Sequence, residues 1–249
     1  MRNSQTRPRI NHGQRTWETH QKSSYVNPAT STHIILVRHG QTEWNDGARF
    51  QGHLDSPLTA DGIAQAEAIG RRISKELIAA IYSSDLGRAK HTAELIARET
   101  RLPVQEDVRL RERSLGVFQG LNRKEAGERY PADMQRYLSR DPQFIVPNGE
   151  SVVQHFEKGF AALEEIAARH GGHRVVVVTH GGLVQGLFRY VTGLGFEARR
   201  RFAIRNAAYN VFIRSEIGWS LETWGDIAHY PEELLRKDGF HERFTPEVQ

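Results

Sequence analysis

The stretch Ile34-Ile35-Leu36-Val37-Arg38-His39-Gly40 indicates the fold of this chain most directly. Its four consecutive aliphatic residues predict a strand buried on both faces, because a strand covered by helices on each side needs no polar alternation. The strand ends in a cation, an imidazole and a flexible glycine. Ligands bind at the carboxyl ends of the strands in open α/β sheets. We therefore expect Arg38 and His39 to face a binding crevice.

A second stretch repeats this design far downstream, as Val175-Val176-Val177-Val178-Thr179-His180-Gly181-Gly182. Here too an aliphatic run ends in a histidine and a glycine. If the two strands are parallel neighbours, their carboxyl ends meet at one edge of the sheet. His39 and His180 then face the same crevice.

The chain has 249 residues, of which 38% are hydrophobic and 26% are charged. This length suits one large α/β domain or two small ones. No apolar run approaches the ~20 residues that a membrane-spanning helix needs, so we expect no membrane partner. The sequence contains no cysteine, which excludes disulfides and thiolate metal sites and makes a cytoplasmic protein the expectation.

Positive charge is concentrated at the amino terminus. Residues 1–32 contain five arginine or lysine residues and one glutamate, and the whole chain has a net charge of +4, so the remainder is neutral. These residues are polar and lack apolar periodicity, which predicts a disordered basic leader. A transit peptide or a nucleic-acid-binding arm fits this composition less well. We therefore expect no nucleic-acid partner.

Helical and strand patterns alternate after the first strand. The helices carry apolar residues at helical spacing, and the strands are short aliphatic runs bounded by turn residues. The predicted elements are a helix from Thr59 to Leu77, a strand over Ile78–Tyr82, a helix over Leu86–Glu99, a less buried strand over Val104–Leu110, helices over Ser151–Ile166 and Leu183–Val191, and strands over Ala207–Arg214 and Ser220–Trp224. This alternation predicts an α/β fold with a mostly parallel sheet flanked by helices.

The chain divides into three parts around this pattern. Residues 33–225 are expected to form the α/β domain. Within it, residues 118–150 are irregular and contain several glycines and prolines, so we expect an insertion that lies over the crevice as a lid. Residues 226–249 are predicted to form a polar C-terminal extension.

The residues at the predicted crevice suit phosphoryl transfer. A neutral imidazole such as His39 is a competent nucleophile towards phosphorus near pH 7. Arg38 and Arg88 could clamp the phosphoryl oxygens, and backbone N–H groups after Gly40 and Gly181 could add donors. Glu112 is the candidate acid for the leaving oxygen. Nearby positive charge lowers the pKa of such a carboxyl, so burial or the charge of the substrate must offset that effect.

A metal site is the main alternative for the two histidines. It is disfavoured because the sequence has no tightly spaced carboxylate or His-x-x-x-His partner, so no metal ligands are predicted. The histidines at 91, 155, 170 and 173 are expected to be surface residues on or beside helices.

Ordered motifs along the chain carry a family resemblance. They are Val37–Asn45, Gly52–Thr59, Ser83–Ala89, Leu110–Arg113 with Gly116 and Gly120, Asn148–Ser151, and Thr179–Gly182. In this order they resemble the histidine phosphatase superfamily in its phosphoglycerate-mutase-like branch, branch 1. The resemblance implies a three-layer α/β/α fold of the phosphoglycerate-mutase type, and an enzyme that needs no metal or other cofactor.

The resemblance also implies a role for each matching residue. His39 is expected to be the phosphorylated nucleophile, and Glu112 to protonate the leaving group and then activate water. Arg38, Arg88 and His180 are expected to hold the phosphoryl group. Further contacts with the phosphate or the substrate are expected from Asn45, Gln51, Gly181 and Arg113.

Two enzymatic readings remain open, both with a small phosphorylated metabolite as substrate. The first is a metal-independent phosphomonoesterase with a phosphohistidine intermediate. The alternative is a phosphoglycerate mutase that uses 2,3-bisphosphoglycerate. The resemblance implies that a cofactor-dependent mutase carries a long insertion with an adjacent arginine pair. Hydrolysis is favoured because the predicted lid is short and contains no such pair between Gly120 and Glu150. A non-catalytic binding module is disfavoured because the nucleophile and the acid are both present. The oligomeric state is left open.

Overall fold

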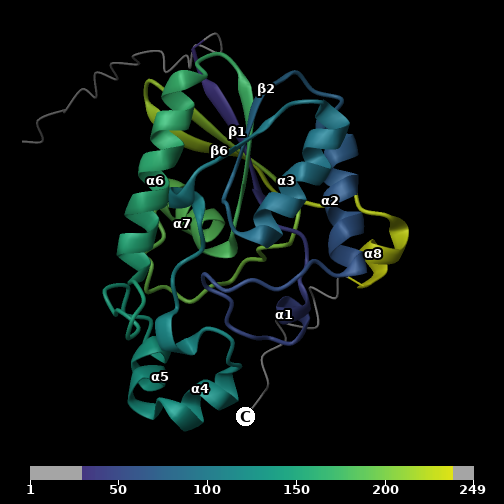
Figure 1. The fold of residues 1–249 in the computed structure, drawn as a ribbon. Coiled ribbons are helices and arrows are strands. Elements are labelled where there is room, and N and C mark those ends of the chain that lie inside the picture. The colour runs from purple at the N-terminus through teal and green to yellow at the C-terminus, as the bar shows by residue number, and fades with distance from the viewer. Residues whose placement is uncertain (1–29, 238–249) are drawn as a thin grey trace, which may run out of the picture.

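The computed structural model describes residues 30–237, and their strands form one mixed sheet in the order β3-β2-β4-β1-β5-β6 (Figure 1). The strands are β1 (Thr32–Arg38), β2 (Ile78–Ser83), β3 (Val104–Glu106), β4 (Arg174–Thr179), β5 (Tyr209–Ser215) and β6 (Gly218–Asp226). The first four strands are parallel to one another, and the antiparallel hairpin of β5 and β6 continues the sheet beyond β1. The predicted mostly parallel sheet is confirmed.

The two histidine-bearing strands are parallel neighbours. In the register of β1 and β4, Val37 lies opposite Val178 and Arg38 lies opposite Thr179. The next residue of each strand is His39 and His180. The two histidines therefore emerge side by side at one edge of the sheet, as the paired sequence motifs predicted.

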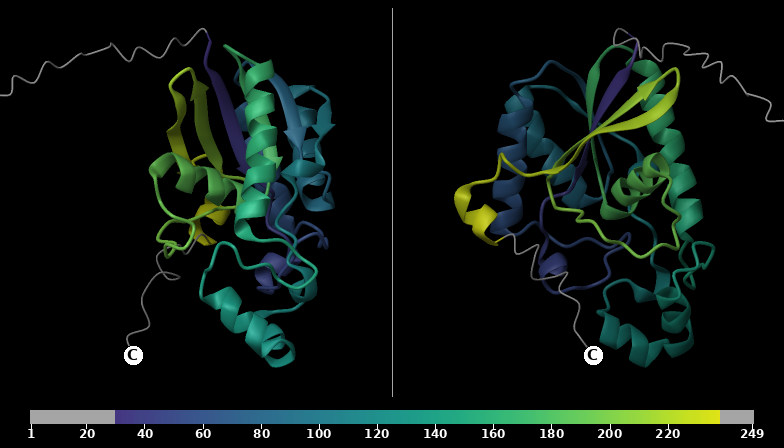
Figure 2. Two further views of the ribbon diagram at one scale, coloured as in Figure 1. Left: turned by 90° about the vertical axis from the view of Figure 1, so that its left-hand side faces the viewer. Right: turned by 180° about the vertical axis from the view of Figure 1, so that it is seen from behind.

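Helices cover both faces of the sheet (Figures 1 and 2). On one face, α2 (Ala60–Ile73) and α3 (Gly87–Thr100) pack against Ile35 and Val37 of β1. On the other face, α6 (Val152–Arg169) and α7 (Gly181–Thr192) pack against Ile34 and Leu36. Successive residues of a strand point to opposite faces, so the unbroken aliphatic run fills two cores at once. This is the expected three-layer α/β/α arrangement.

The strand predicted over Val104–Leu110 is wrong in its second half. β3 ends at Glu106, and a short 3₁₀ helix, η1, occupies Val108–Leu110. Asp107 causes the change because its side chain accepts a hydrogen bond from the backbone N–H of Arg109 at 2.9 Å. A side chain that hydrogen-bonds to the backbone in this way competes with the next hydrogen bond between β3 and its neighbouring strand.

Residues 118–150 form a small cluster of their own beyond the carboxyl end of the sheet, near the short helix α1 (Glu43–Asp46) (Figure 1). The cluster contains α4 (Arg123–Arg129) and α5 (Pro131–Leu138) and follows η2 (Gly116–Phe118). Its buried side chains are Phe118, Ala126, Met134, Phe144 and Val146, with Leu115. The segment therefore has a separate apolar core next to the edge that carries the histidines.

The two ends of the domain differ from the predicted boundaries. Thr32 is buried within β1 and donates to the carbonyl of Ala167 at 2.7 Å, so it belongs to the domain and not to a leader. Residues 226–237 pack against the domain: α8 (Glu232–Lys237) lies beside α2 (Figure 1), its Leu234 is buried, and its Lys237 donates to Asp61 at 2.9 Å. Residues 1–29 of the predicted leader and residues 238–249 lie outside the described residues. No helix within residues 30–237 is long and apolar enough to cross a membrane.

Two glycines bring the chain after β1 into close contact with the start of α2. A Cβ on Gly62 would lie 2.0 Å from the carbonyl oxygen of Gln41, and a Cβ on Gly40 would lie 2.4 Å from the carbonyl oxygen of Gly62. Both obstacles are backbone atoms, which cannot rotate away as a side chain does. This contact fixes the backbone directly after His39.

We predict that Gly62→Ala lowers the free energy of unfolding by about 2 kcal/mol, because the added methyl group overpacks a backbone contact. The matched control is Gly127→Ala within α4, where the nearest atom to a new Cβ is Met134 Cγ at 4.0 Å. That control should gain up to about 1 kcal/mol, because alanine favours a helix over glycine. Urea denaturation measures both. Equal effects of the two changes would contradict the assigned contact.

Candidate active site

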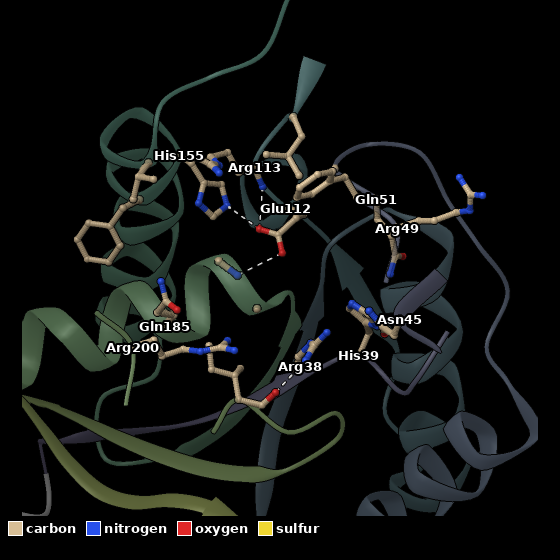
Figure 3. A pocket seen from close by; sticks show the side chains of 18 of the residues that line it. Arg38, His39, Asn45, Arg49, Gln51, Glu112, Arg113, His155, Gln185 and Arg200 are labelled. Carbon is tan, nitrogen blue, oxygen red and sulfur yellow. Dashed lines mark hydrogen bonds and ion pairs between the residues drawn. The ribbon is translucent and has the colours of Figure 1, made fainter. Parts of the chain in front are cut away.

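A cavity of about 310 Å³ opens where β1 and β4 end (Figure 3). Of the nine predicted site residues, eight line it: Arg38, His39, Asn45, Gln51, Arg88, Glu112, Arg113 and Gly181. The ninth, His180, is fully buried beside His39, with the two ring centroids 5.2 Å apart. Residues far apart in the sequence thus converge on one cavity.

His39 is buried, and its hydrogen bonds define which ring nitrogen is free. Nδ1 lies 2.8 Å from the carbonyl oxygen of Gly40. A carbonyl oxygen only accepts, so Nδ1 carries the proton and the neutral ring presents an unprotonated Nε2. Burial lowers the pKa of His39 well below its ordinary value, and the charges of Arg38 and Arg88 lower it further. His39 is therefore a neutral imidazole with a free lone pair at neutral pH.

Two arginines beside His39 are held by main-chain carbonyl groups. Arg38 donates to the carbonyl of Ile204 at 2.8 Å, and Arg88 donates to those of Gly52 and Leu54 at 2.8 and 2.9 Å. Arg88 also forms an ion pair with Asp55 at 2.8 Å. The buried Nε of each has no hydrogen-bond partner in the described part of the chain. Burial lowers the pKa of Arg38 to about 10, which leaves it charged at neutral pH. The Nε–H of each arginine is therefore a donor that a ligand could use.

His180 is oriented by a serine at the end of β2. Its Nε2 lies 2.9 Å from Ser84 Oγ, and its buried Nδ1 has no partner among residues 30–237. Burial lowers the pKa of His180 well below its ordinary value, with Arg88 and His39 adding to the effect. A second neutral imidazole with an unused nitrogen therefore lies next to the first.

Glu112 is held by backbone donors from two segments. Its Oε1 accepts from the N–H of Arg113 at 2.9 Å, and its Oε2 accepts from the N–H of Gly182 at 3.2 Å. His155 Nε2 lies 3.9 Å from Oε1 (Figure 3). Burial raises the pKa of Glu112, but His155, the two backbone donors and Arg88 outweigh burial and lower it. The carboxyl group is thus fixed in place and ionised in the unliganded site.

Gln51 and Asn45 belong to a polar network around Thr42. Gln51 Nε2 donates to Thr42 Oγ1 at 2.8 Å, and its buried Oε1 has no partner within the described residues. Asn45 Oδ1 accepts from the backbone N–H of Thr42 at 3.2 Å. This network keeps both amides at the cavity wall.

The backbone donors predicted after Gly40 are not available. The N–H of Gly40 donates to Thr92 Oγ1, and the N–H of Gln41 donates to Gln65 Oε1, each at 3.0 Å. The N–H of Gly182 at the start of α7 is taken by Glu112. These groups position the loops and the acid, so side chains supply most of the free donors.

His155 is not a surface residue, so that prediction is wrong. It is buried, lines the cavity and has Nε2 at 3.0 Å from the carbonyl oxygen of Arg111. Helical spacing from Ser151 places it on the same face as Ala162 and Ile166, a signal that the sequence contained. Asn206 was also missed, and it donates to the carbonyl oxygen of His39 at 2.8 Å. No local pattern marked Asn206, Gln185 or Arg200.

The arrangement suits a small tetrahedral anion. An unprotonated imidazole nitrogen lies beside two arginines and a second imidazole with free donor capacity, and a carboxyl group lies across the cavity. Guanidinium groups match the oxygens of such an anion in geometry and charge.

Comparisons with known proteins agree with this geometry. The family model described as histidine phosphatase superfamily (branch 1) matches residues 34–227. The metal-independent phosphoserine phosphatase of Arabidopsis thaliana is 39% identical over 212 residues, which cover 84% of this chain and 87% of that protein. The probable phosphoglycerate mutase GpmB of Proteus mirabilis is 38% identical over 207 residues, which cover 81% and 96%.

A solved structure extends the similarity to three dimensions. A mycobacterial glucosyl-3-phosphoglycerate phosphatase in complex with VO3 matches with a TM-score of 0.67 at 31% identity, covering 80% of this chain and 100% of that one. The ordered motifs, the three-layer fold and the histidine–arginine cavity all agree with these matches. The chain belongs to branch 1 of the histidine phosphatase superfamily.

Proposed function

We propose that this protein hydrolyses small phosphomonoesters through a phosphohistidine on His39, without a metal ion. The observation that carries the proposal is the neutral, buried His39 with its free Nε2 between Arg38 and Arg88. Relatives and structural neighbours named as phosphatases of small metabolites support the hydrolase reading.

In the first step, the lone pair on His39 Nε2 attacks phosphorus as the ester P–O bond breaks. Arg38 and Arg88 stabilise the charge on the non-bridging oxygens through their unpaired Nε donors. His180 Nδ1 supplies a further donor when the hydroxyl of Ser84 donates to Nε2. The leaving oxygen takes a proton from Glu112.

In the second step, water attacks the phosphorus of phosphohistidine, and Glu112 accepts the proton of that water. The P–N bond breaks, its electron pair returns to Nε2, and inorganic phosphate leaves. Glu112 must be protonated in the first step although its pKa is low in the empty site. A substrate dianion raises that pKa in the complex, because two neighbouring negative charges disfavour ionisation.

Residues 118–150 are proposed to act as the lid of this site, and Tyr137 of α5 contributes to the cavity wall. The alternative reaction is phosphoglycerate mutation with 2,3-bisphosphoglycerate, as in relatives named probable mutases. The short segment between Phe118 and Glu150 favours hydrolysis. We place the enzyme in the cytoplasm because its sequence contains no cysteine.

We predict fast release of phosphate from an aryl phosphate in the presence of EDTA, and a loss of at least about 10³-fold in kcat/KM for His39→Ala. Phosphate release is measured directly, with His91→Ala on α3 as a histidine control. Activity that survives in His39→Ala would contradict the phosphohistidine. Isomerisation of 3-phosphoglycerate that depends on 2,3-bisphosphoglycerate, with little free phosphate, would identify a mutase instead.

We predict that Glu112→Gln slows alkyl phosphates by roughly 10² to 10⁴-fold and aryl phosphates much less. An alkoxide needs a proton to leave, whereas a phenolate leaves without one. The slope of log kcat/KM against the pKa of the leaving group measures this effect in both proteins. An equal loss for alkyl and aryl esters would exclude Glu112 as the acid.

We predict that kcat/KM for an aryl phosphate shows no inflection near pH 6.5. The lowered pKa of His39 keeps the nucleophile neutral as the pH falls through the range in which an ordinary histidine gains a proton. The profile is measured from pH 5.5 to 8 and corrected for ionisation of the substrate. A tenfold fall per pH unit beginning at 6.5 would show that His39 titrates normally.

A further inference from the structure

A second cavity of about 410 Å³ adjoins the catalytic cavity. The two share lining residues, namely Arg113, Tyr137, Val152, Gln185, Phe196 and Arg200. In Figure 3, Gln185 and Arg200 lie across the cavity from His39 and Gln51. The second cavity therefore continues from the catalytic cavity on the side away from the nucleophile.

Arginine dominates the lining of this second cavity. Of its described lining residues, six are arginines, at positions 113, 123, 140, 189, 199 and 200, and one, Asp141, is acidic. These arginines come from separate parts of the chain: the segment after Glu112, the start of α4, the end of α5, and α7 with the loop that follows it. The tertiary structure thus gathers positive charge that is dispersed in the sequence.

Five of these six arginines have no ion-pair partner among the described residues. Within residues 30–237, the guanidinium groups at positions 113, 123, 140, 199 and 200 form no ion pair and no hydrogen bond. Elsewhere in the structure arginines are commonly paired, as in Arg49 with Glu125 at 2.7 Å and Arg214 with Glu164 at 3.0 Å. Five guanidinium groups without an ion-pair partner among the described residues therefore lie around one cavity.

The sixth arginine holds the loop that carries two of the others. Arg189 is buried in α7 and donates to the carbonyls of Gly195 at 2.5 Å and Ala198 at 2.7 Å. These bonds tie down the segment directly before Arg199 and Arg200. The backbone that leads into Arg199 and Arg200 is therefore held by a buried side chain.

Gathering like charges around one cavity costs free energy. Desolvation lowers the pKa of Arg200, and the nearby charge of Arg123 lowers it further. We therefore expect the two guanidinium groups to repel each other. An anionic group between them would relieve this repulsion and gain charge-assisted hydrogen bonds.

We propose that the second cavity binds a second anionic group of the substrate, a carboxylate or a phosphate. This inference rests on the proposed phosphatase function, because it concerns the substrate of the same site. Arg113 and Arg200 line both cavities, so they lie along the path that joins the two groups. The preferred substrates are then phosphomonoesters with an anionic group at their far end.

The test compares three alkyl phosphates of equal chain length: 6-hydroxyhexyl phosphate, 6-phosphonooxyhexanoate and hexane-1,6-diol bisphosphate. We expect kcat/KM to be at least about tenfold higher for one or both substrates with an anionic tail. A preference for one tail identifies carboxylate or phosphate as the group recognised. Equal kcat/KM for all three overturns this inference but leaves the phosphatase intact, whereas no hydrolysis of any phosphomonoester, aryl phosphate included, overturns the proposed function.

The matched variants are the double change Arg123→Gln/Arg140→Gln and the control Arg129→Gln. The first two residues line the second cavity but not the catalytic one, and Arg129 lies on α4 outside both linings. The double variant should reduce the preference for the anionic tail at least tenfold, mainly through KM, and the control should retain the preference. Retention of the full preference in the double variant would overturn the assignment of the cavity.

Discussion

The site depends on the parallel pairing of β1 with β4. In this register Val37 lies opposite Val178, and the residues that follow each strand, His39 and His180, bring their rings to 5.2 Å. A slip of one residue would turn each strand's side chains to the opposite layer. Because both strands are aliphatic and buried on both faces, the two cores fix this register. Hydrophobic packing of the two cores therefore fixes the position of His39 relative to His180.

The burial of His39 at the end of β1 also determines its protonation state. Arg38 and Arg88 hydrogen-bond to carbonyl oxygens, each with its Nε unpaired within the described residues. Their charges, added to burial, keep His39 neutral. Glu112 lies in the same cavity, but backbone N–H groups hold it. No ion pair joins Glu112 to Arg38 or Arg88 within the described residues, so the Nε groups of both arginines and the carboxyl group can each contact a ligand.

Cations without an ion-pair partner among the described residues also lie beyond the catalytic cavity, around the second cavity. Arg49 and Arg214 pair with glutamates, whereas five arginines of the second cavity form no ion pair within residues 30–237. Water stabilises an unpaired arginine on an open surface. Several arginines around one cavity repel one another, because their like charges lie close together. The buried Arg189 holds the segment before two of these arginines in place through two carbonyl groups. Arginine side chains therefore line both the second cavity and the catalytic cavity that contains His39.

The sequence by itself determined the sheet, its flanking helices and the residues at the strand ends, because aliphatic runs, helical spacing and terminal polar motifs are local signals. It also marked His39, Glu112 and the arginines of the motifs. The tertiary structure decided what depends on distant segments meeting. It buried His155 next to Glu112 and placed the side chain of Asn206 on the carbonyl oxygen of His39. It also brought Arg123 and Arg200 to the lining of one cavity. No spacing in a sequence records such contacts, because they arise only when loops from separate elements converge.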